Sequence, residues 1–133
     1  IVPSGHRWEQ YRRIYPDDIL DEPLVMREET AGTREVLLQN LHMHDISIDM
    51  LNVSMTLGNT EAIEIAVEEG LGVAFVSRLA AERGIKLGRV VEVDVEGMSL
   101  KRQIYMFRSR SIPQTLSQAK FWEFISQSVA NKK

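Results

Sequence analysis

Two short polar turns, residues 30–33 (T-A-G-T) and residues 58–60 (G-N-T), have the composition of a binding site for a small ion. Each turn follows a predicted strand and opens a predicted helix. The N-terminus of a helix presents free N–H groups and the positive end of the helix dipole, which suit carboxylate, sulfate or phosphate. In parallel α/β sheets, ligands bind beyond the carboxyl ends of the strands. The turns therefore predict an anion site, with helix capping alone as the simpler interpretation.

Residue patterns typical of catalysis or of a metal centre are weak or missing in the sequence. There is no cysteine, which excludes disulfides, thiolate metal ligands and cysteine nucleophiles. His42 and His44 are two residues apart, so they do not share a helix face, and no well-placed third ligand accompanies them. Glu28 and Glu29 are neighbours that point apart, and no serine has the setting of a nucleophile elbow. We therefore predict no catalytic residue, no metal site and no cofactor.

The composition is that of one globular domain with a core. The 133 residues are 44% apolar and carry 16 basic against 19 acidic side chains, a net charge of −3. This acidic balance disfavours DNA binding by the chain itself. No apolar run approaches the roughly 18 residues that a membrane helix needs. The lack of cysteine fits a reducing cytoplasm, and a start at Ile1 without Met predicts a piece of a longer protein.

Apolar periodicity and turn residues predict the elements that hold the two turns. Strands are predicted at residues 24–26, 50–57, 73–76, 90–95 and 103–108. Helices are predicted at residues 16–20, 31–43, 61–69, 78–83 and 117–129. The predicted N-caps of the last four helices are, in order, Thr30, Asn59 or Thr60, Ser77 and Ser117. Gly70 and Gly84 are predicted to end the helices at residues 61–69 and 78–83. This order predicts an α/β fold, a Rossmann-like mixed, mostly parallel sheet flanked by helices.

Three segments of the chain resemble one family. Residues 23–34 read P-L-V-M-R-E-E-T-A-G-T-R and resemble the P-L-I-x-R-E-x-G-S-G-T-R segment of LysR-type transcriptional regulators. Residues 58–63 with Val67, followed by residues 70–77 (G-L-G-V-A-F-V-S), are similar to that family's G-S-x-E-A-I…V-x-x-G-L-G-I-A-x-L-S. The resemblance runs in the same order and spacing from residue 1 to about residue 125, so the three segments together are fairly specific.

The resemblance implies a type II periplasmic-binding-protein-like fold, in which two α/β lobes joined by two crossing strands close on a small effector. Residues 1–133 are then expected to form one effector-binding lobe. Its hinge strands are expected at about residues 1–3 and 103–109, and a C-terminal helix at about 115–129 would belong to the other lobe. The DNA-binding domain of the family, a winged helix-turn-helix, is expected to be absent from this chain.

The resemblance places the family's effector contacts in this lobe on two groups of residues. They are Thr30, Ala31, Gly32, Thr33, Asn59 and Thr60. One departure matters, because Ala31 stands where the family commonly has serine, and Thr30 stands where it has glycine. Hydroxyl contacts must therefore come from Thr30 or Thr33, which leaves room for an effector unlike the commonest kinds.

The expected function is that of an effector-sensing fragment of a bacterial LysR-type regulator. A small anionic or polar effector would close the lobes, change the arrangement of subunits in a homo-oligomer and so alter transcription in the cytoplasm. DNA would be contacted only through the absent winged helix-turn-helix, and neither an enzymatic activity nor a membrane segment is expected. One alternative is a fragment of a periplasmic solute-binding protein of the same fold. Another is a scaffold without any ligand response.

Overall fold

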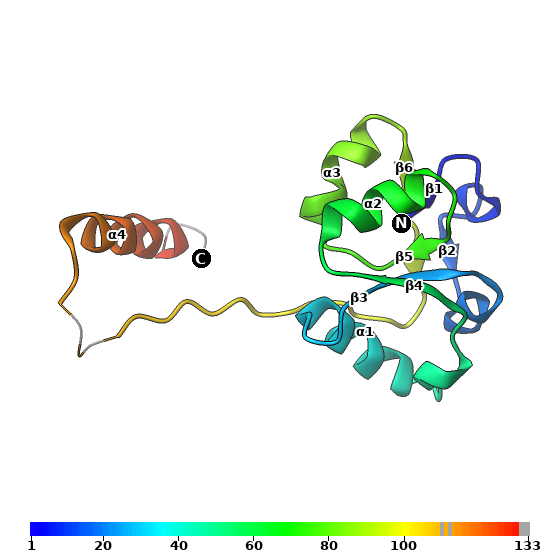
Figure 1. Cartoon of the computed structure of the whole chain (residues 1–133), viewed down its shortest axis with the longest axis horizontal. Coiled ribbons are helices and arrows are strands. Elements are labelled where there is room, and N and C mark those ends of the chain that lie inside the picture. The colour runs from blue at the N-terminus through cyan, green and yellow to red at the C-terminus, as the bar shows by residue number, and fades with distance from the viewer. Residues whose placement is uncertain (110, 112, 131–133) are drawn as a thin grey trace. The chain divides into compact units, whose positions relative to one another are not determined.

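The computed structural model of the protein describes residues 1–109, 111 and 113–130. The chain divides into two units, Ile1–Arg102 and Gln103–Lys133, and each is described by itself (Figure 1). The first unit contains the sheets, three α-helices and the hydrophobic core. The candidate site therefore lies within the first unit.

A three-stranded parallel sheet lies at the centre of the first unit. Its strands are β3 (Leu24–Arg27), β4 (Val53–Leu57) and β5 (Val73–Ala74), arranged in the order β4-β3-β5. Both neighbours run parallel to β3, so the carboxyl ends of the strands meet at one edge of the sheet. The predicted, mostly parallel sheet is confirmed.

The central strand β3 is covered on both faces. Leu24 and Met26 belong to the core cluster that contains the buried side chains of α1 (Gly32–His42). Val25, which points the other way, belongs to the cluster that contains the buried side chains of α2 (Thr60–Glu68). Figure 1 shows α1 and α2 on opposite sides of the sheet. The apolar run in β3 therefore supplies both halves of the core.

The remaining elements of the first unit complete the lobe around this sheet. They are β1 (Val2–Pro3), η1 (Arg7–Glu9), β2 (Arg13–Ile14), η2 (Pro16–Asp21), η3 (Ile48–Met50), α3 (Arg78–Lys86), β6 (Val90–Val91) and β7 (Asp94–Val95). Strand β1 pairs with β6 in antiparallel orientation, and β2 pairs with β7 in parallel orientation. The predicted strand over residues 90–95 is thus two short strands with different partners.

The helix α3 is longer than predicted because Gly84 does not end it. Gly84 lies inside the helix, where an added Cβ would meet the carboxylate of Glu64 and would lie 3.0 Å from Cγ2 of Val90. Glycine therefore permits the close packing of α3 against its neighbours. The helix ends at Lys86 with Leu87 as its C-cap, and Gly88, with a φ of +67°, adopts the left-handed conformation of the exit.

Two predicted caps also differ from the structure. Ser77 precedes α3, but its side chain makes no capping hydrogen bond. The last helix, α4 (Leu116–Ala130), begins before Ser117 and is capped by Thr115 instead. The Thr115 hydroxyl accepts from the Gln118 backbone N–H at 3.3 Å, while the Gln118 side chain accepts from the Thr115 N–H at 3.0 Å. This reciprocal pair is a capping box.

The strand predicted at residues 103–108 is not formed. The segment 103–109 has no regular secondary structure, and within the described part of the second unit no strand pairs with it. A strand requires a neighbouring strand to pair with its backbone N–H and C=O groups, and the local sequence does not show whether such a neighbour exists. The strand predicted at about residues 1–3 is formed as β1. Among the described residues, no helix combines the length and apolar character needed to cross a bilayer.

Candidate functional site

The first polar turn leads from β3 into α1 without a side-chain cap. The backbone N–H of Ala31 donates to the carbonyl oxygen of Glu28 at 3.1 Å, and Ala31 occupies the N-cap position. Thr30 is exposed and lies one residue before the cap, so its predicted capping role is wrong. Because Ala31 has no side-chain oxygen, the cap offers no side-chain acceptor to the first backbone N–H groups of α1, at Gly32 and Thr33.

The second turn leads from β4 into α2 and is capped as predicted. Asn59 is the N-cap, and its Oδ1 accepts from the backbone N–H of Ala62 at 2.7 Å. Thr60 is therefore the first residue of the helix. The Asn59 side-chain oxygen is engaged by this cap, so the turn meets β3 through the Thr60 hydroxyl and the Gly58 carbonyl oxygen.

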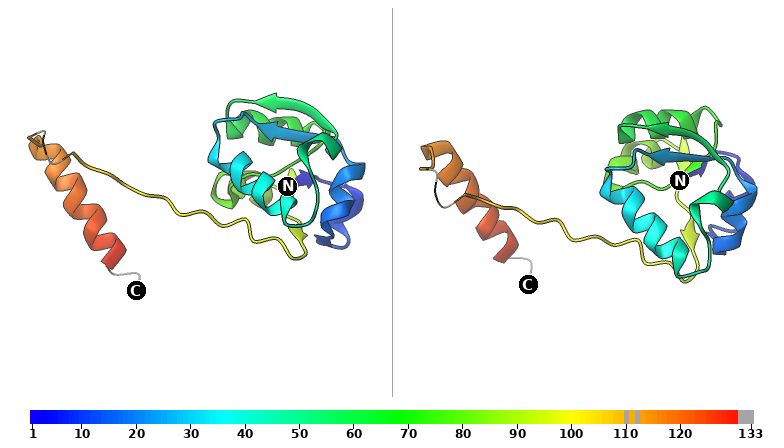
Figure 2. Two further views of the ribbon diagram at one scale, coloured as in Figure 1. Left: turned by 90° about the horizontal axis from the view of Figure 1, so that it is seen from below. Right: turned by 60° about the horizontal axis from the view of Figure 1, so that its bottom comes forward.

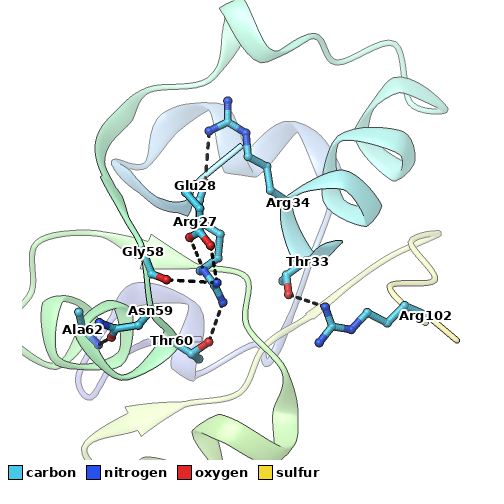
Figure 3. A network of polar contacts seen from close by, with 9 residues as sticks. All are labelled: Arg27, Glu28, Thr33, Arg34, Gly58, Asn59, Thr60, Ala62 and Arg102. Carbon is cyan, nitrogen blue, oxygen red and sulfur yellow. Dashed lines mark hydrogen bonds and ion pairs between the residues drawn. The ribbon is translucent and has the colours of Figure 1, made fainter. Parts of the chain in front are cut away.

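Arg27, the last residue of β3, ties the end of that strand to the second turn. Its Nη1 donates to the Thr60 hydroxyl at 3.0 Å, and its Nη2 donates to the Gly58 carbonyl oxygen at 3.3 Å. The same guanidinium forms two bonds to the Glu28 carboxylate, at 2.8 Å from Nε and 2.7 Å from Nη2. Figure 3 shows this guanidinium between Glu28 and Thr60. The paired carboxyl ends of β3 and β4 are thus fixed by one side chain.

The Arg27–Glu28 pair is electrostatically strong. The two hydrogen bonds from Arg27, assisted by a backbone hydrogen bond, lower the pKa of Glu28 to about 2. The hydrogen bond to Glu28 also raises the pKa of Arg27. Both groups are therefore charged at neutral pH, and the Glu28 carboxylate balances the charge of Arg27.

A second arginine reaches the first turn from far along the chain. Arg102 Nη1 donates to the Thr33 hydroxyl at 3.2 Å across a separation of 69 residues (Figure 3). An added Cβ on Gly32 would lie 3.4 Å from the same nitrogen, so the guanidinium lies against the first turn of α1. Among the described residues, Arg102 has no carboxylate within ion-pair distance. Its charge is balanced less than that of Arg27.

The structure brings the two predicted turns to the same edge of the sheet, because Arg27 pairs with Leu57 at the ends of β3 and β4. Thr33 and Thr60 each present a hydroxyl that accepts from an arginine. The sequence predictions missed both arginines. Arg27 has a local signal, since it ends a buried strand just before the first turn, whereas nothing local connects Arg102 to Thr33.

The two histidines considered as metal ligands do not form such a site. His44 contacts the backbone oxygen of Gly97 through Nε2 at 3.3 Å, and His42 lies exposed in the last turn of α1. Within residues 1–109, 111 and 113–130, no group of three His, Asp or Glu side chains is placed to hold a metal ion.

Comparison with known proteins places this chain in a family. Residues 1–130 match the LysR substrate binding domain family. The chain is 35% identical over 127 residues to an uncharacterized HTH-type transcriptional regulator of Methanocaldococcus jannaschii, and the match covers 96% of this chain and 43% of that protein. It is 37% identical over 105 residues to a probable RuBisCO transcriptional regulator of Cyanidioschyzon merolae, and this match covers 79% of this chain and 35% of that protein. The chain thus spans less than half the length of these relatives.

A solved structure supports the fold. The regulatory domain of CcmR from Synechocystis PCC6803, determined in complex with 2-PG, superposes with a TM-score of 0.78 at 22% identity. The match covers 92% of this chain and 58% of that one. The expected fold, a lobe of the type II periplasmic-binding-protein kind, is confirmed. The chain belongs to the LysR substrate-binding domain family, and both relatives named above are described as transcriptional regulators.

Proposed function

We propose that this chain is the effector-sensing part of a LysR-type transcriptional regulator and binds a small anionic effector between the two polar turns. The observation that carries the proposal is that Thr33 and Thr60, on neighbouring turns, each accept a hydrogen bond from an arginine. A hydroxyl that accepts such a bond keeps its own proton to donate. Two such donors beside two helix N-termini suit a ligand that carries negative charge and accepts hydrogen bonds.

The effector contacts that we propose are Thr30, Ala31, Gly32, Thr33, Asn59 and Thr60. They do not contribute equally. Thr33 and Thr60 offer hydroxyl donors, and Gly32 and Thr33 offer backbone N–H groups. Asn59 contributes mainly by capping α2, and Thr30 contributes an exposed hydroxyl.

The relatives support a role in regulation. The Cyanidioschyzon merolae relative is described as a probable RuBisCO transcriptional regulator, and the Synechocystis domain was solved with 2-PG bound. Neither is a solute-binding protein, so the alternative of a periplasmic fragment gains no support from them. We propose ligand binding rather than catalysis, in a cytoplasmic homo-oligomer whose DNA contacts are made by a winged helix-turn-helix outside this chain.

Calorimetry on the chain, with 2-PG and inorganic phosphate as probes, tests the assignment. Thr33→Val removes the hydroxyl and should weaken binding by about tenfold or more, because a hydrogen bond to a charged group is lost. Thr56→Val is the matched control, since Thr56 is an exposed residue of β4 that makes no side-chain bond among the described residues. Equal affinities of Thr33→Val and the wild type for every probe that binds would contradict the proposed site.

A further inference from the structure

A short segment, residues 97–102, lies along α1 and is here named the strap (Figure 2). Near its start, His44 Nε2 lies 3.3 Å from the carbonyl oxygen of Gly97. Further along, the backbone N–H of Ser99 donates to Oδ1 of Asn40 at 3.0 Å. Asn40 is only 6% exposed, so this bond forms at the edge of the core. Residues far apart in sequence thus hold the strap on the helix.

The glycine at the start of the strap is required by the geometry. Gly97 has a φ of +73°, and an added Cβ would lie 3.0 Å from the ring of His44. A larger residue would be strained in this conformation and would also press on the ring. The strap is therefore closely fitted to the C-terminal end of α1.

The strap ends at the candidate site. Its last residue, Arg102, makes the third tie by donating to the Thr33 hydroxyl in the first turn of α1. The three ties therefore extend from the C-terminal end of α1 to its N-terminal end. The chain leaves the first unit immediately after Arg102.

We propose that Arg102 is a positioning residue of the effector site, through which occupancy of the site is coupled to the strap. The inference rests on the proposed function. The bond from Arg102 directs the Thr33 hydroxyl proton toward the ligand and holds the end of the strap on α1. An anion at the first turn of α1 attracts the Arg102 guanidinium and so makes the strap less mobile. Because coupling between two parts is reciprocal, loosening the strap weakens effector binding.

Hydrogen exchange of the whole chain, followed by mass spectrometry, tests the tie without any ligand. Arg102→Gln should speed exchange of the strap amides by about threefold to tenfold, the effect of losing one exposed hydrogen bond. Lys101→Gln is the matched control, because it removes the same charge from a neighbouring exposed residue that makes no side-chain contact among the described residues. Thr33→Val should have the same effect as Arg102→Gln, and the double variant should add nothing further.

Equal strap exchange in Arg102→Gln and Lys101→Gln would overturn the proposal, as would additive effects in the double variant. A second arm repeats the exchange with 2-PG and with inorganic phosphate. A probe that binds should slow strap exchange in the wild type and in Lys101→Gln, but not in Arg102→Gln. A probe that binds and leaves strap exchange unchanged would also overturn the coupling. If neither probe binds the wild type, a phosphate-bearing effector is contradicted, while the ligand-free comparison still decides the role of Arg102.

Discussion

Arg27 and Arg102 have different roles although both donate to a threonine hydroxyl. Arg27 is held by both oxygens of Glu28, and its charge is neutralised there. It fixes the second turn relative to the end of β3. Arg102 is exposed and has only the Thr33 hydroxyl as a hydrogen-bond partner among the described residues. At the proposed site, an anionic effector would therefore meet positive charge chiefly from Arg102 and the helix N-termini.

The Glu28 carboxylate should make stability depend on acid pH. Its pKa is about 2 in the folded chain and about 4.3 in an unfolded one, so its stabilising effect is fully present above about pH 5. The effect declines as the unfolded state gains its proton and is lost as the pH falls through 2. Urea unfolding over this range should show a steeper loss of stability in the wild type than in Glu28→Gln.

Glu29→Gln is the matched control for that measurement. Glu29 is the next residue, and its carboxylate lies 3.9 Å from Arg34 with 88% of the side chain exposed. This variant should keep the steep pH dependence of the wild type. Identical profiles for Glu28→Gln and the wild type would show that the Arg27–Glu28 pair does not contribute to stability.

The sequence predicts those contacts of the site that join residues close together in the chain, and it misses those that join distant residues. Asn59 caps the helix that begins next to it, and such local chemistry is visible in a few residues. Thr30 misled the prediction because a hydroxyl just before a helix is typical of a cap, whereas the chain turns one residue later at Ala31. Arg102 is separated from Thr33 by 69 residues, and only the fold brings them together.

The central strand β3 is tightly packed at its start, and Gly72 is the residue that allows this. An added Cβ on Gly72 would meet the backbone oxygen of Pro23 and would lie 3.0 Å from its carbonyl carbon, at a φ of +151°. Because the clash is with backbone, β5 would have to move away from β3. We expect Gly72→Ala to lower the free energy of unfolding by more than about 3 kcal/mol.

Gly88→Ala separates backbone strain from this clash. Gly88 has a φ of +67°, and nothing lies within 4 Å of an added Cβ. Its substitution should cost only about 1–2 kcal/mol, the strain of a left-handed residue. Urea unfolding followed by circular dichroism measures both variants. Equal losses would show that the sheet can shift away from the added methyl group.

The elements were predictable where one chain segment decides them. The helix α2 has its buried residues at spacings of three and four, and β3 is apolar throughout, so both were found. Helices and strands whose extent depends on packing against another element were predicted less well. Gly84 was interpreted as a helix end because glycine often is one, but its lack of a side chain serves the packing against Glu64 and Val90. The segment 103–108 contains the apolar run I-Y-M-F and so resembles a strand, yet it has no strand beside it in the described part of its unit.

The molecule as a whole exposes apolar side chains on both units. In the first unit Leu79 of α3 is 85% exposed, and in the second Leu116 and Phe121 of α4 are 74% and 60% exposed. In α4, Trp122 is partly covered by the Arg108 guanidinium, which lies 5.1 Å from the centre of the ring. Exposed apolar area favours association by roughly 25 cal/mol per Å², before the entropy of association is subtracted.

This exposure predicts self-association of the chain through α4. At micromolar concentration, sedimentation should give a homodimer or larger assembly, because a second copy can cover Phe121 and its apolar neighbours. Phe121→Glu should raise the dissociation constant by about tenfold or more, since a charge replaces the aromatic surface that association buries. Gln127→Glu adds the same charge at an exposed polar position of the same helix and should leave the assembly intact. A wild-type chain that sediments as a monomer, or equal effects of the two variants, would contradict association through this helix.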